Sequence, residues 1–478
     1  MDWPAGTEPD AVQRMETSFH ALRAASRQDI DVPLALRRDR LKRLCTLLNR
    51  HCSDFEAAIS DDFGHRSAHE TRFAETVTVE AAIKHALRHV ARWMKDRRVP
   101  TDLHFRPGSN RLLPQPLGVV GVIAPWNYPL MLSLSPVVSA LAAGNLVMIK
   151  PSERVPRFSA CLNKAISEYF DATEVVVVEG GPEISERFAA LPFDHLLFTG
   201  STRVGRLVAA SAAKNLTPVT LELGGKSPVI IDHSAELAAA ARRIAFGKLL
   251  NAGQTCIAPD YVLCPANMQE QFVELFFGAV STLYGSDPGN PDYTTIIDAA
   301  DYERLQRLID DGAAKGARIE HRVDKPEEWK LTRKLPPCLV LATSDDMLVR
   351  REEIFGPILP VIPYERAEQA IAFVNDRDRP LALYWFGTDR DARDRVIRET
   401  VSGGVTVNDC LTHIAQEHQP FGGVGASGSG SYHGEWGFRS FSKEKPIFYQ
   451  SRLSWLELLL PPYGRVFDWT IRLLRLII

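Results

Sequence analysis

Cys256 stands in a short stretch of small and polar residues, 251–260, which follows a segment with helical periodicity. A cysteine in such a loop can be exposed and reactive, and its thiolate would act as a nucleophile. A core cysteine would instead stand within an apolar run. The residues alone also allow a packed, unreactive thiol at this position.

Two other segments carry groups that could complete such a site. Glu222 ends a predicted strand and is followed by two glycines, and sites in α/β sheets form at strand ends. Asn127 lies between two prolines, which restrict its backbone and would present its side-chain amide rigidly. The carboxylate could act as a base and the amide as an oxyanion donor.

Three further segments offer groups for a phosphorylated cofactor. Residues 200–205 follow a predicted strand and open a helix, whose first N–H groups can bind phosphate. Lys150 and Glu153 follow another strand and offer a cation and a carboxylate. Glu353 stands close to the aromatic Phe355. The pattern indicates binding positions for a phosphate and for a ribose.

The elements that would position these groups alternate regularly. Periodicity predicts helices over 33–60 and 67–97, and four prolines then mark an extended stretch. We expect strands over 118–124, 145–149, 174–178, 195–198 and 217–222, and in a second series over 228–231, 261–264, 338–341, 358–363, 381–386 and 404–407. Apolar strands that alternate with helices belong to buried parallel sheets. The sequence therefore predicts an α/β fold of two doubly wound parallel-sheet domains.

The composition is typical of a soluble globular protein. The chain has 478 residues, of which 45% are hydrophobic and 24% charged, and a net charge of −3. This balance disfavours a nucleic-acid partner. The chain has seven cysteines but no CxxC pair, so we expect no disulfide framework. The first segment is acidic and no apolar run reaches 18 residues, so we expect neither a signal peptide nor a spanning helix. Together these features predict a cytoplasmic protein.

Several familiar motifs are incomplete in this chain. Residues 423–428 match GxGxxG but follow no predicted strand, which a dinucleotide fingerprint requires. Thr220 stands where a Walker A motif needs glycine. Two histidine pairs have the i,i+4 spacing of helix-borne ligands: His65 with His69, and His85 with His89. Neither belongs to an HExxH pattern, so we expect no metal site.

Seven motifs, in this order, resemble those of the aldehyde dehydrogenase superfamily: PWNYP, KPSE, FTGSTRVG, LELGGKSP, GQTC, EEIFGP and PFGGVGASG. Within the superfamily, GQTCIAPDYVLC, NDCLTH and SYHGEWGFRSFS resemble the class-3 branch. The resemblance implies NAD(P)-dependent oxidation of an aldehyde to a carboxylic acid. It also implies a homodimer.

The resemblance assigns catalytic roles to particular residues. Cys256 would be the nucleophile and would carry a thiohemiacetal and then a thioester. The Asn127 side chain and the Cys256 N–H would hold the oxyanion, and Glu222 would activate water for hydrolysis. A lowered pKa of the thiol and a raised pKa of the carboxyl would help. Tyr128, Thr255 and His413 match positions near the substrate tunnel.

Other residues match cofactor-binding positions of the family. These are Lys150 and Glu153 at the adenosine ribose, Gly200, Ser201 and Gly205 at the pyrophosphate, Glu353 at the nicotinamide ribose and Phe355 beside it. A carboxylate near the adenosine ribose favours NAD. Class-3 relatives often accept NADP as well, so we expect NAD with NADP as a possible second cofactor.

The implied substrate is an aromatic, coniferaldehyde-like aldehyde or a medium-chain aliphatic one. A coenzyme A-acylating enzyme is an alternative, but such relatives commonly lack the glutamate of LELGG, which is present here as Glu222. A non-catalytic binding protein with the same fold is a second alternative.

The resemblance also divides the chain into functional regions. We expect helices of the NAD-binding domain in 1–98, an extended oligomerisation arm in 99–116 and the Rossmann-like NAD-binding domain in 117–223. The catalytic domain would span 224–410, and 411–450 would return to the NAD-binding domain and form an oligomerisation strand. The apolar tail 451–478 could form an amphipathic helix on a membrane surface, or dock on its own or a partner subunit.

Overall fold

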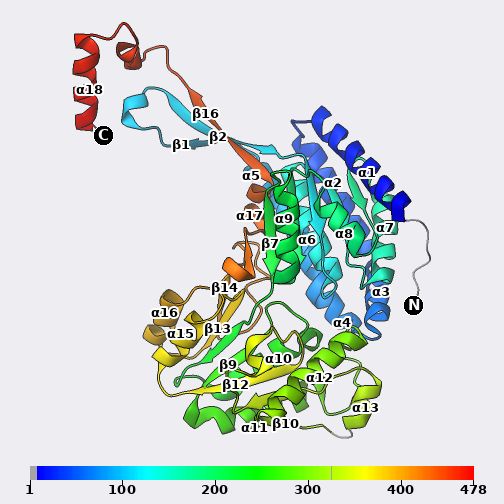
Figure 1. The fold of residues 1–478 in the computed structure, drawn as a ribbon. Coiled ribbons are helices and arrows are strands. Elements are labelled where there is room, and N and C mark those ends of the chain that lie inside the picture. The colour runs from blue at the N-terminus through cyan, green and yellow to red at the C-terminus, as the bar shows by residue number, and fades with distance from the viewer. Residues whose placement is uncertain (1–7, 324–325, 478) are drawn as a thin grey trace.

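The computed structural model describes residues 8–323 and 326–477, which form two α/β lobes and a protruding arm (Figure 1). Each lobe is built around one mainly parallel sheet with helices against it. This architecture confirms the predicted fold class.

The first lobe contains a six-stranded sheet with the order β15-β7-β6-β3-β4-β5. Its strands are β3 (Val119–Ile123), β4 (Leu146–Lys150), β5 (Val175–Val177), β6 (His195–Gly200), β7 (Val219–Leu223) and the short β15 (Gly428–Ser429). All pairs are parallel except that of β15 with β7. The chain passes from β3 to β4 and β5 on one side and to β6 and β7 on the other. Strand order therefore reverses between β3 and β6, and α/β sheets bind ligands at such a point.

Helices cover both faces of this sheet. Against one face pack α1 (Glu8–Gln28), α8 (Pro182–Ala189) and α9 (Thr202–Ala213), which share an apolar cluster with the strands. Against the other lie α2 (Leu34–Arg50), α3 (Cys52–Phe63), α4 (Ala68–Thr71), the π-helical turn η1 (Arg72–Thr76), α5 (Val77–Trp93), α6 (Pro129–Ala143), α7 (Pro156–Tyr169) and α17 (Gly434–Ser440). Every residue of α6 is buried, so this helix is the centre of the lobe's core.

The helical stretch predicted over 33–60 is divided into two helices, because the chain breaks at His51. This residue has φ −103° and ψ 11°, and it ends α2 and begins α3. Its ring nitrogens bond the carboxylates of Asp54 and Glu168 at 3.1 and 3.0 Å. Apolar periodicity runs through both helices and so hides the break.

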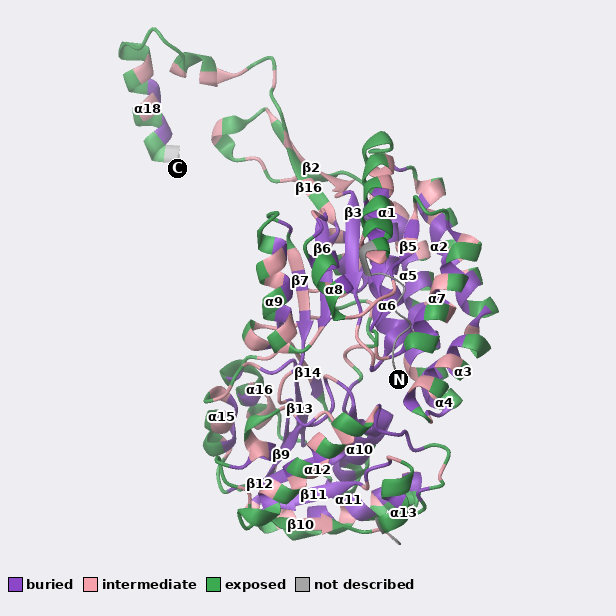
Figure 2. Cartoon of the chain, turned by 45° about the vertical axis from the view of Figure 1, so that its right-hand side comes forward, coloured by how far each residue is buried: buried purple, intermediate pink, exposed green. Residues whose placement is uncertain are grey.

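The second lobe contains a seven-stranded sheet with the order β10-β11-β12-β9-β8-β13-β14. Its strands are β8 (Pro228–Ile231), β9 (Tyr261–Pro265), β10 (Arg318–His321), β11 (Cys338–Leu341), β12 (Ile358–Tyr364), β13 (Ala382–Phe386) and β14 (Gly404–Val407). Only the edge strand β10 runs antiparallel to its neighbour. The helices are α10 (Leu237–Leu249), η3 (Leu250–Gly253), η4 (Ala266–Met268), α11 (Gln269–Tyr284), α12 (Ala299–Ala314), α13 (Pro326–Leu331), α14 (Leu348–Arg351), α15 (Ala367–Asn375) and α16 (Arg390–Glu399). Figure 2 shows buried strands at the centre of each lobe and exposed outer helix faces.

The four residues 224–227 join the two sheets, from the carboxyl end of β7 to the amino end of β8. The carboxyl edge of the first sheet therefore faces the amino edge of the second. Because β9, β12 and β13 run parallel to β8, the loops that precede them end at this same junction.

The arm is a three-stranded sheet of β1 (Arg97–Val99), β2 (Ser109–Pro116) and β16 (Ser442–Tyr449), with η2 (Leu103–Phe105) at its turn. The predicted helix 67–97 is too long, because α5 ends at Trp93 and the chain enters β1. Beyond β16, η6 (Trp455–Leu459) and α18 (Arg465–Ile477) lie at the outer end of the arm (Figure 1). Within the described residues, no helix combines the length and the apolar character needed to cross a membrane.

Candidate active site

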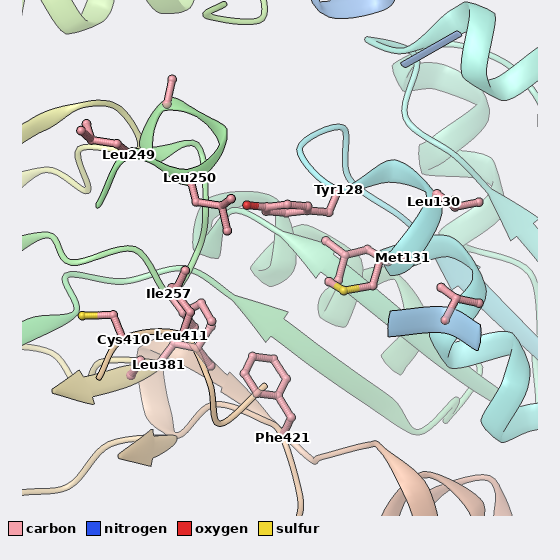
Figure 3. Packing of buried hydrophobic residues seen from close by; sticks show 14 of the residues in the cluster. Tyr128, Leu130, Met131, Leu249, Leu250, Ile257, Leu381, Cys410, Leu411 and Phe421 are labelled. Atoms are coloured by element: carbon pink, nitrogen blue, oxygen red, sulfur yellow. The ribbon is translucent and has the colours of Figure 1, made fainter. Parts of the chain in front are cut away.

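A cavity of about 320 Å³ lies at the junction of the two lobes. Its wall is mainly apolar and includes the side chains shown in Figure 3 around Tyr128, Leu250, Ile257 and Phe421. Among the groups that could do chemistry, Glu222 and Cys256 both line it. The cavity therefore brings together a carboxyl group from the first sheet and a thiol from the second lobe.

Cys256 stands in the loop between η3 and β9 and is half-buried. Burial, together with the nearby carboxyl groups of Glu353 and Glu222, raises the pKa of its thiol to about 12. This shift is opposite to the lowered pKa that would favour a thiolate. At neutral pH the thiol keeps its proton, so a base must remove it during attack.

Glu222 is the penultimate residue of β7 and is buried. Neither of its carboxyl oxygens has a hydrogen-bond partner within the part of the chain that the structure describes. Burial raises the pKa of this carboxyl well above its ordinary value. A carboxyl group with a raised pKa in an apolar cavity can take a proton from a thiol or from water.

Asn127 lies in the loop from β3 to α6 and is also buried. Its side-chain Nδ2 donates to the carbonyl oxygen of Gln254 at 3.1 Å, two residues before Cys256. This bond uses one of the two amide hydrogens. The other is free, within the described contacts, to donate to an oxygen on a carbon bonded to Cys256.

The loop that carries the cysteine has a strained backbone. Asn251 and Ala252 have φ angles of 54° and 51°, a region that non-glycine residues seldom occupy. Hydrogen bonds hold this conformation: Asn251 Nδ2 donates to the Asn127 and Gln254 carbonyls at 2.9 and 3.1 Å, and Gln254 Nε2 donates to the Thr295 carbonyl at 3.1 Å. Strain of this kind persists where the surroundings over-determine it.

The predicted adenosine and phosphate residues lie at the carboxyl edge of the first sheet. Lys150 ends β4, and its buried Nζ donates to the Pro151 carbonyl at 2.7 Å and lies 3.8 Å from Glu153 Oε2. Ser201 follows the final strand residue Gly200, caps α9 and accepts from the Val204 N–H at 3.4 Å. These groups flank the strand-order reversal.

Close packing keeps the start of α9 against the sheet. A side chain at Gly205 would collide with Leu223 of β7, so only glycine lets the helix approach. The free N–H groups of the first turn then face outward at the sheet edge. The start of α9 fits the diphosphate of a dinucleotide, and Lys150 and Glu153 fit its ribose.

Glu353 and Phe355 stand in the loop before β12 and reach the connection between the lobes. The Glu353 carboxylate lies against Gly224, where a side chain would collide with it. Burial, together with Asp260, raises the pKa of Glu353 to about 7. The Phe355 ring meets Trp126 edge-on at 5.5 Å. Phe355 therefore lies beside the loop that carries Asn127, and Glu353 lies beside the connection between the lobes.

Two of the three predicted substrate residues line the cavity. The Tyr128 hydroxyl and Thr255 Oγ1 are 2.7 Å apart, and Figure 3 shows the Tyr128 ring reaching toward Leu250. His413 does not line it, although Thr412 and Ile414 do.

The ring of His413 is held by contacts with β14. Its Nδ1 bonds Thr406 Oγ1 at 2.8 Å, and the ring packs against Gly404. Both partners belong to β14, and the ring also lies 5.9 Å from that of Phe421, which lines the cavity. Burial lowers the pKa of His413 to about 4.

The sequence analysis missed one group of buried charges beside the site: Arg66, Glu70 and Glu75. They lie between α3 and α5, in a region where helical periodicity predicts that charged side chains are exposed to solvent. The only available signal was the polarity of these residues within an otherwise apolar segment.

Comparison with known proteins decides the family. The model of the aldehyde dehydrogenase family matches residues 3–447. This chain belongs to the aldehyde dehydrogenase family. The enzyme is 48% identical over 454 residues to a probable coniferyl aldehyde dehydrogenase of Pseudomonas aeruginosa, which covers 95% of this chain and 94% of the relative.

Two further relatives place this aldehyde dehydrogenase in the class-3 branch. It is 41% identical over 434 residues to aldehyde dehydrogenase family 3 member A2 of Mus musculus, covering 90% of this chain and 88% of that one. The solved substrate-bound state of Staphylococcus aureus AldH superposes with a TM-score of 0.90 at 38% identity, covering 96% of this chain and 99% of the other. The predicted family and branch are confirmed, and the protein is an NAD(P)-dependent aldehyde dehydrogenase.

Proposed function

We propose that the enzyme oxidises an apolar, aromatic aldehyde of the coniferaldehyde type to its acid through a thioester on Cys256. The observation that carries this proposal is the apolar cavity that Cys256 and Glu222 share, together with the hydrogen bond from the Asn127 amide to the loop of Cys256. Three relatives at 44–48% identity, of which one is named a coniferyl aldehyde dehydrogenase and two are named probable ones, support the aromatic substrate.

The first half of the reaction forms the thioester. Cys256 Sγ attacks the aldehyde carbon while its proton passes to Glu222, and the new oxyanion accepts from Asn127 Nδ2 and the Cys256 N–H. A nicotinamide cofactor, when bound, supplies the hydride acceptor. As the C–H bond breaks, the oxyanion collapses to a carbonyl and leaves the acyl group on sulfur.

The second half releases the acid. Glu222 first releases to solvent the proton that it took from the thiol. It then takes a proton from water, which it later returns to the departing sulfur, and the hydroxide attacks the thioester carbon. The C–S bond breaks, the carboxylic acid leaves and the thiol is restored. The presence of Glu222 in the cavity favours water over coenzyme A as the acyl acceptor.

The direct test is a panel of aldehydes with NAD⁺ and with NADP⁺, followed through the absorbance of the reduced cofactor. We expect coniferaldehyde and other aromatic aldehydes to give the highest kcat/KM, with straight-chain aldehydes second. Turnover that requires coenzyme A would instead identify an acylating enzyme, and binding without turnover would identify a non-catalytic relative.

Glu153 is expected to set the preference for NAD⁺. Its carboxylate stands at the carboxyl end of β4, where it would meet the adenosine ribose and repel a 2′-phosphate. Glu153→Gln should raise kcat/KM for NADP⁺ relative to NAD⁺ about tenfold, which corresponds to ~1.4 kcal/mol. Glu16→Gln, on the outer helix α1, is the control and should leave the ratio unchanged. A Glu153→Gln ratio equal to wild type would remove the residue from cofactor selection.

We also propose a cytoplasmic homodimer that uses the arm, with the tail as a further contact surface. β16 has an open edge opposite β2 in the described sheet, and Val466, Trp469 and Leu476 of α18 are exposed. The tail helix also contacts η2 of its own arm. Light scattering should give twice the 53.2 kDa chain mass, and vesicle sedimentation tests whether the tail binds a membrane surface.

A further inference from the structure

We infer that Arg66 is a positioning residue for the oxyanion donor Asn127, through a buried ionic triad with Glu70 and Glu75. This inference rests on the proposed role of Asn127. Arg66 precedes α4, its side chain is fully buried, and its Nη1 donates to the Asn127 carbonyl oxygen at 3.2 Å. The guanidinium also lies over the Tyr128 ring, 4.9 Å from its centroid.

Glu75 connects the arginine to the start of α6. Its Oε1 accepts from Arg66 Nη1 at 2.8 Å, and its Oε2 accepts from the N–H groups of Leu130 and Met131 at 2.8 and 3.0 Å. These are donors of the helix's first turn, so the carboxylate caps α6 from a distance. The loop that carries Asn127 is thus fixed at its carbonyl and at the helix that follows it.

Glu70 connects the same arginine to the second lobe. Its Oε1 lies 3.3 Å from Arg66 Nε and 3.3 Å from Thr294 Oγ1, and the backbone N–H of Asn251 also hydrogen-bonds this carboxyl. Asn251 begins the strained loop that ends at Cys256. The triad therefore holds the amide donor of one lobe in register with the thiol of the other.

This arrangement explains why a costly buried charge stands here. Burying an ion pair seldom adds stability over apolar packing, whereas a displacement of about 1 Å in a catalytic group can cost about 100-fold in rate. A lysine at position 66 would keep the charge but lose the planar fork that reaches Glu75, Glu70 and the Asn127 carbonyl together.

The test is a double-mutant cycle with Asn127. Arg66→Lys should lower kcat for aldehyde oxidation at least tenfold in the wild-type background. In the Asn127→Ala background it should lower the remaining rate less than twofold, because the donor that it positions is gone. Equal losses in the two backgrounds would overturn the inference, since a general structural defect acts regardless of Asn127.

Arg40→Lys is the matched control. Arg40 is a buried arginine of the same lobe, paired with Glu174 at 3.0 Å, and belongs to α2. We expect both lysine variants to lower the melting temperature, and only Arg66→Lys to lower kcat. If Arg66→Lys does not fold, Glu75→Gln replaces it in the cycle, since the amide oxygen can still accept from the α6 N–H groups.

A second readout separates this inference from the proposed function. p-Nitrophenyl acetate can acylate Cys256 without a cofactor: the thiolate displaces p-nitrophenolate and leaves an acetyl thioester, through the same oxyanion. The rate of p-nitrophenolate release in the first turnover should fall with Arg66→Lys in the wild-type background and change little in the Asn127→Ala background. If the ester assay shows coupling between Arg66 and Asn127 but no aldehyde is oxidised, the proposed function is wrong and the inference stands. If aldehydes are oxidised at a rate that Arg66→Lys does not change, the proposed function stands and the inference is wrong.

Discussion

Replacement of Cys256 by alanine is expected to lower aldehyde oxidation at least about 10⁴-fold, because it removes the sulfur to which the acyl group is proposed to bond. The substitution removes one half-buried sulfur atom, so the free energy of unfolding should change by about 1 kcal/mol or less. The measurement is reduced-cofactor formation at saturating aldehyde, together with thermal unfolding.

The matched control is Cys161→Ser on α7, a half-buried thiol of the first lobe outside the cavity. This variant should keep wild-type kcat. Mass spectrometry adds a direct observation: wild type incubated with p-nitrophenyl acetate should gain one acetyl group, and Cys256→Ala should gain none at the site. Sustained oxidation by Cys256→Ala would remove the thioester from the reaction.

Glu222→Gln is expected to stop the cycle after one turnover. Without the base, water attack on the thioester should slow by about 10²–10⁴-fold. The first turnover should also be slower than in wild type, because Glu222 takes the Cys256 proton, but it should remain faster than hydrolysis and still give reduced cofactor up to the enzyme concentration. Rapid mixing measures this burst, and mass spectrometry should find the acyl group on the protein. A steady state as fast as that of wild type would exclude Glu222 as the base.

The same carboxyl predicts a pH dependence. The pKa of Glu222 is raised by burial, and the base is active only when deprotonated, so wild-type kcat should rise as the pH passes through that raised pKa. The Gln variant should lack this rise. Stability should change in the opposite direction, because a buried carboxyl with a raised pKa favours the folded state at low pH and loses that contribution as the pH increases. The advantage of Glu222→Gln in melting temperature should therefore grow toward alkaline pH.

The sequence was sufficient to predict the features that local patterns encode. Continuous apolar strands between helices gave both parallel sheets, and strand-end motifs gave the neighbourhood of Cys256 and Glu222, which the structure brings into one cavity. Their catalytic roles, and the cofactor roles of Lys150 and Glu353, remain predictions for the experiments above.

What the sequence did not predict depends on contacts between distant segments. Arg66 reaches Asn127 across sixty-one positions, and no spacing rule joins such residues. His413 bonds β14 and does not itself line the cavity, although Thr412 and Ile414 do, a difference that only the local backbone decides. The break at His51 depends on a bond to Glu168 of another helix.

The pairing of β2 with β16 has a consequence for biosynthesis. Pro116 pairs with Ser442, and Ser109 with Tyr449, so β2 leaves the ribosome long before its partner is translated. Until then its edge is an open template for other chains. The Asn145 side chain donates to the Phe441 carbonyl at 2.8 Å, so this hydrogen bond also cannot form until residue 441 has been translated. Nascent and prematurely terminated chains thus carry an unfinished arm, and only a chain translated through Tyr449 can offer the completed surface to a partner.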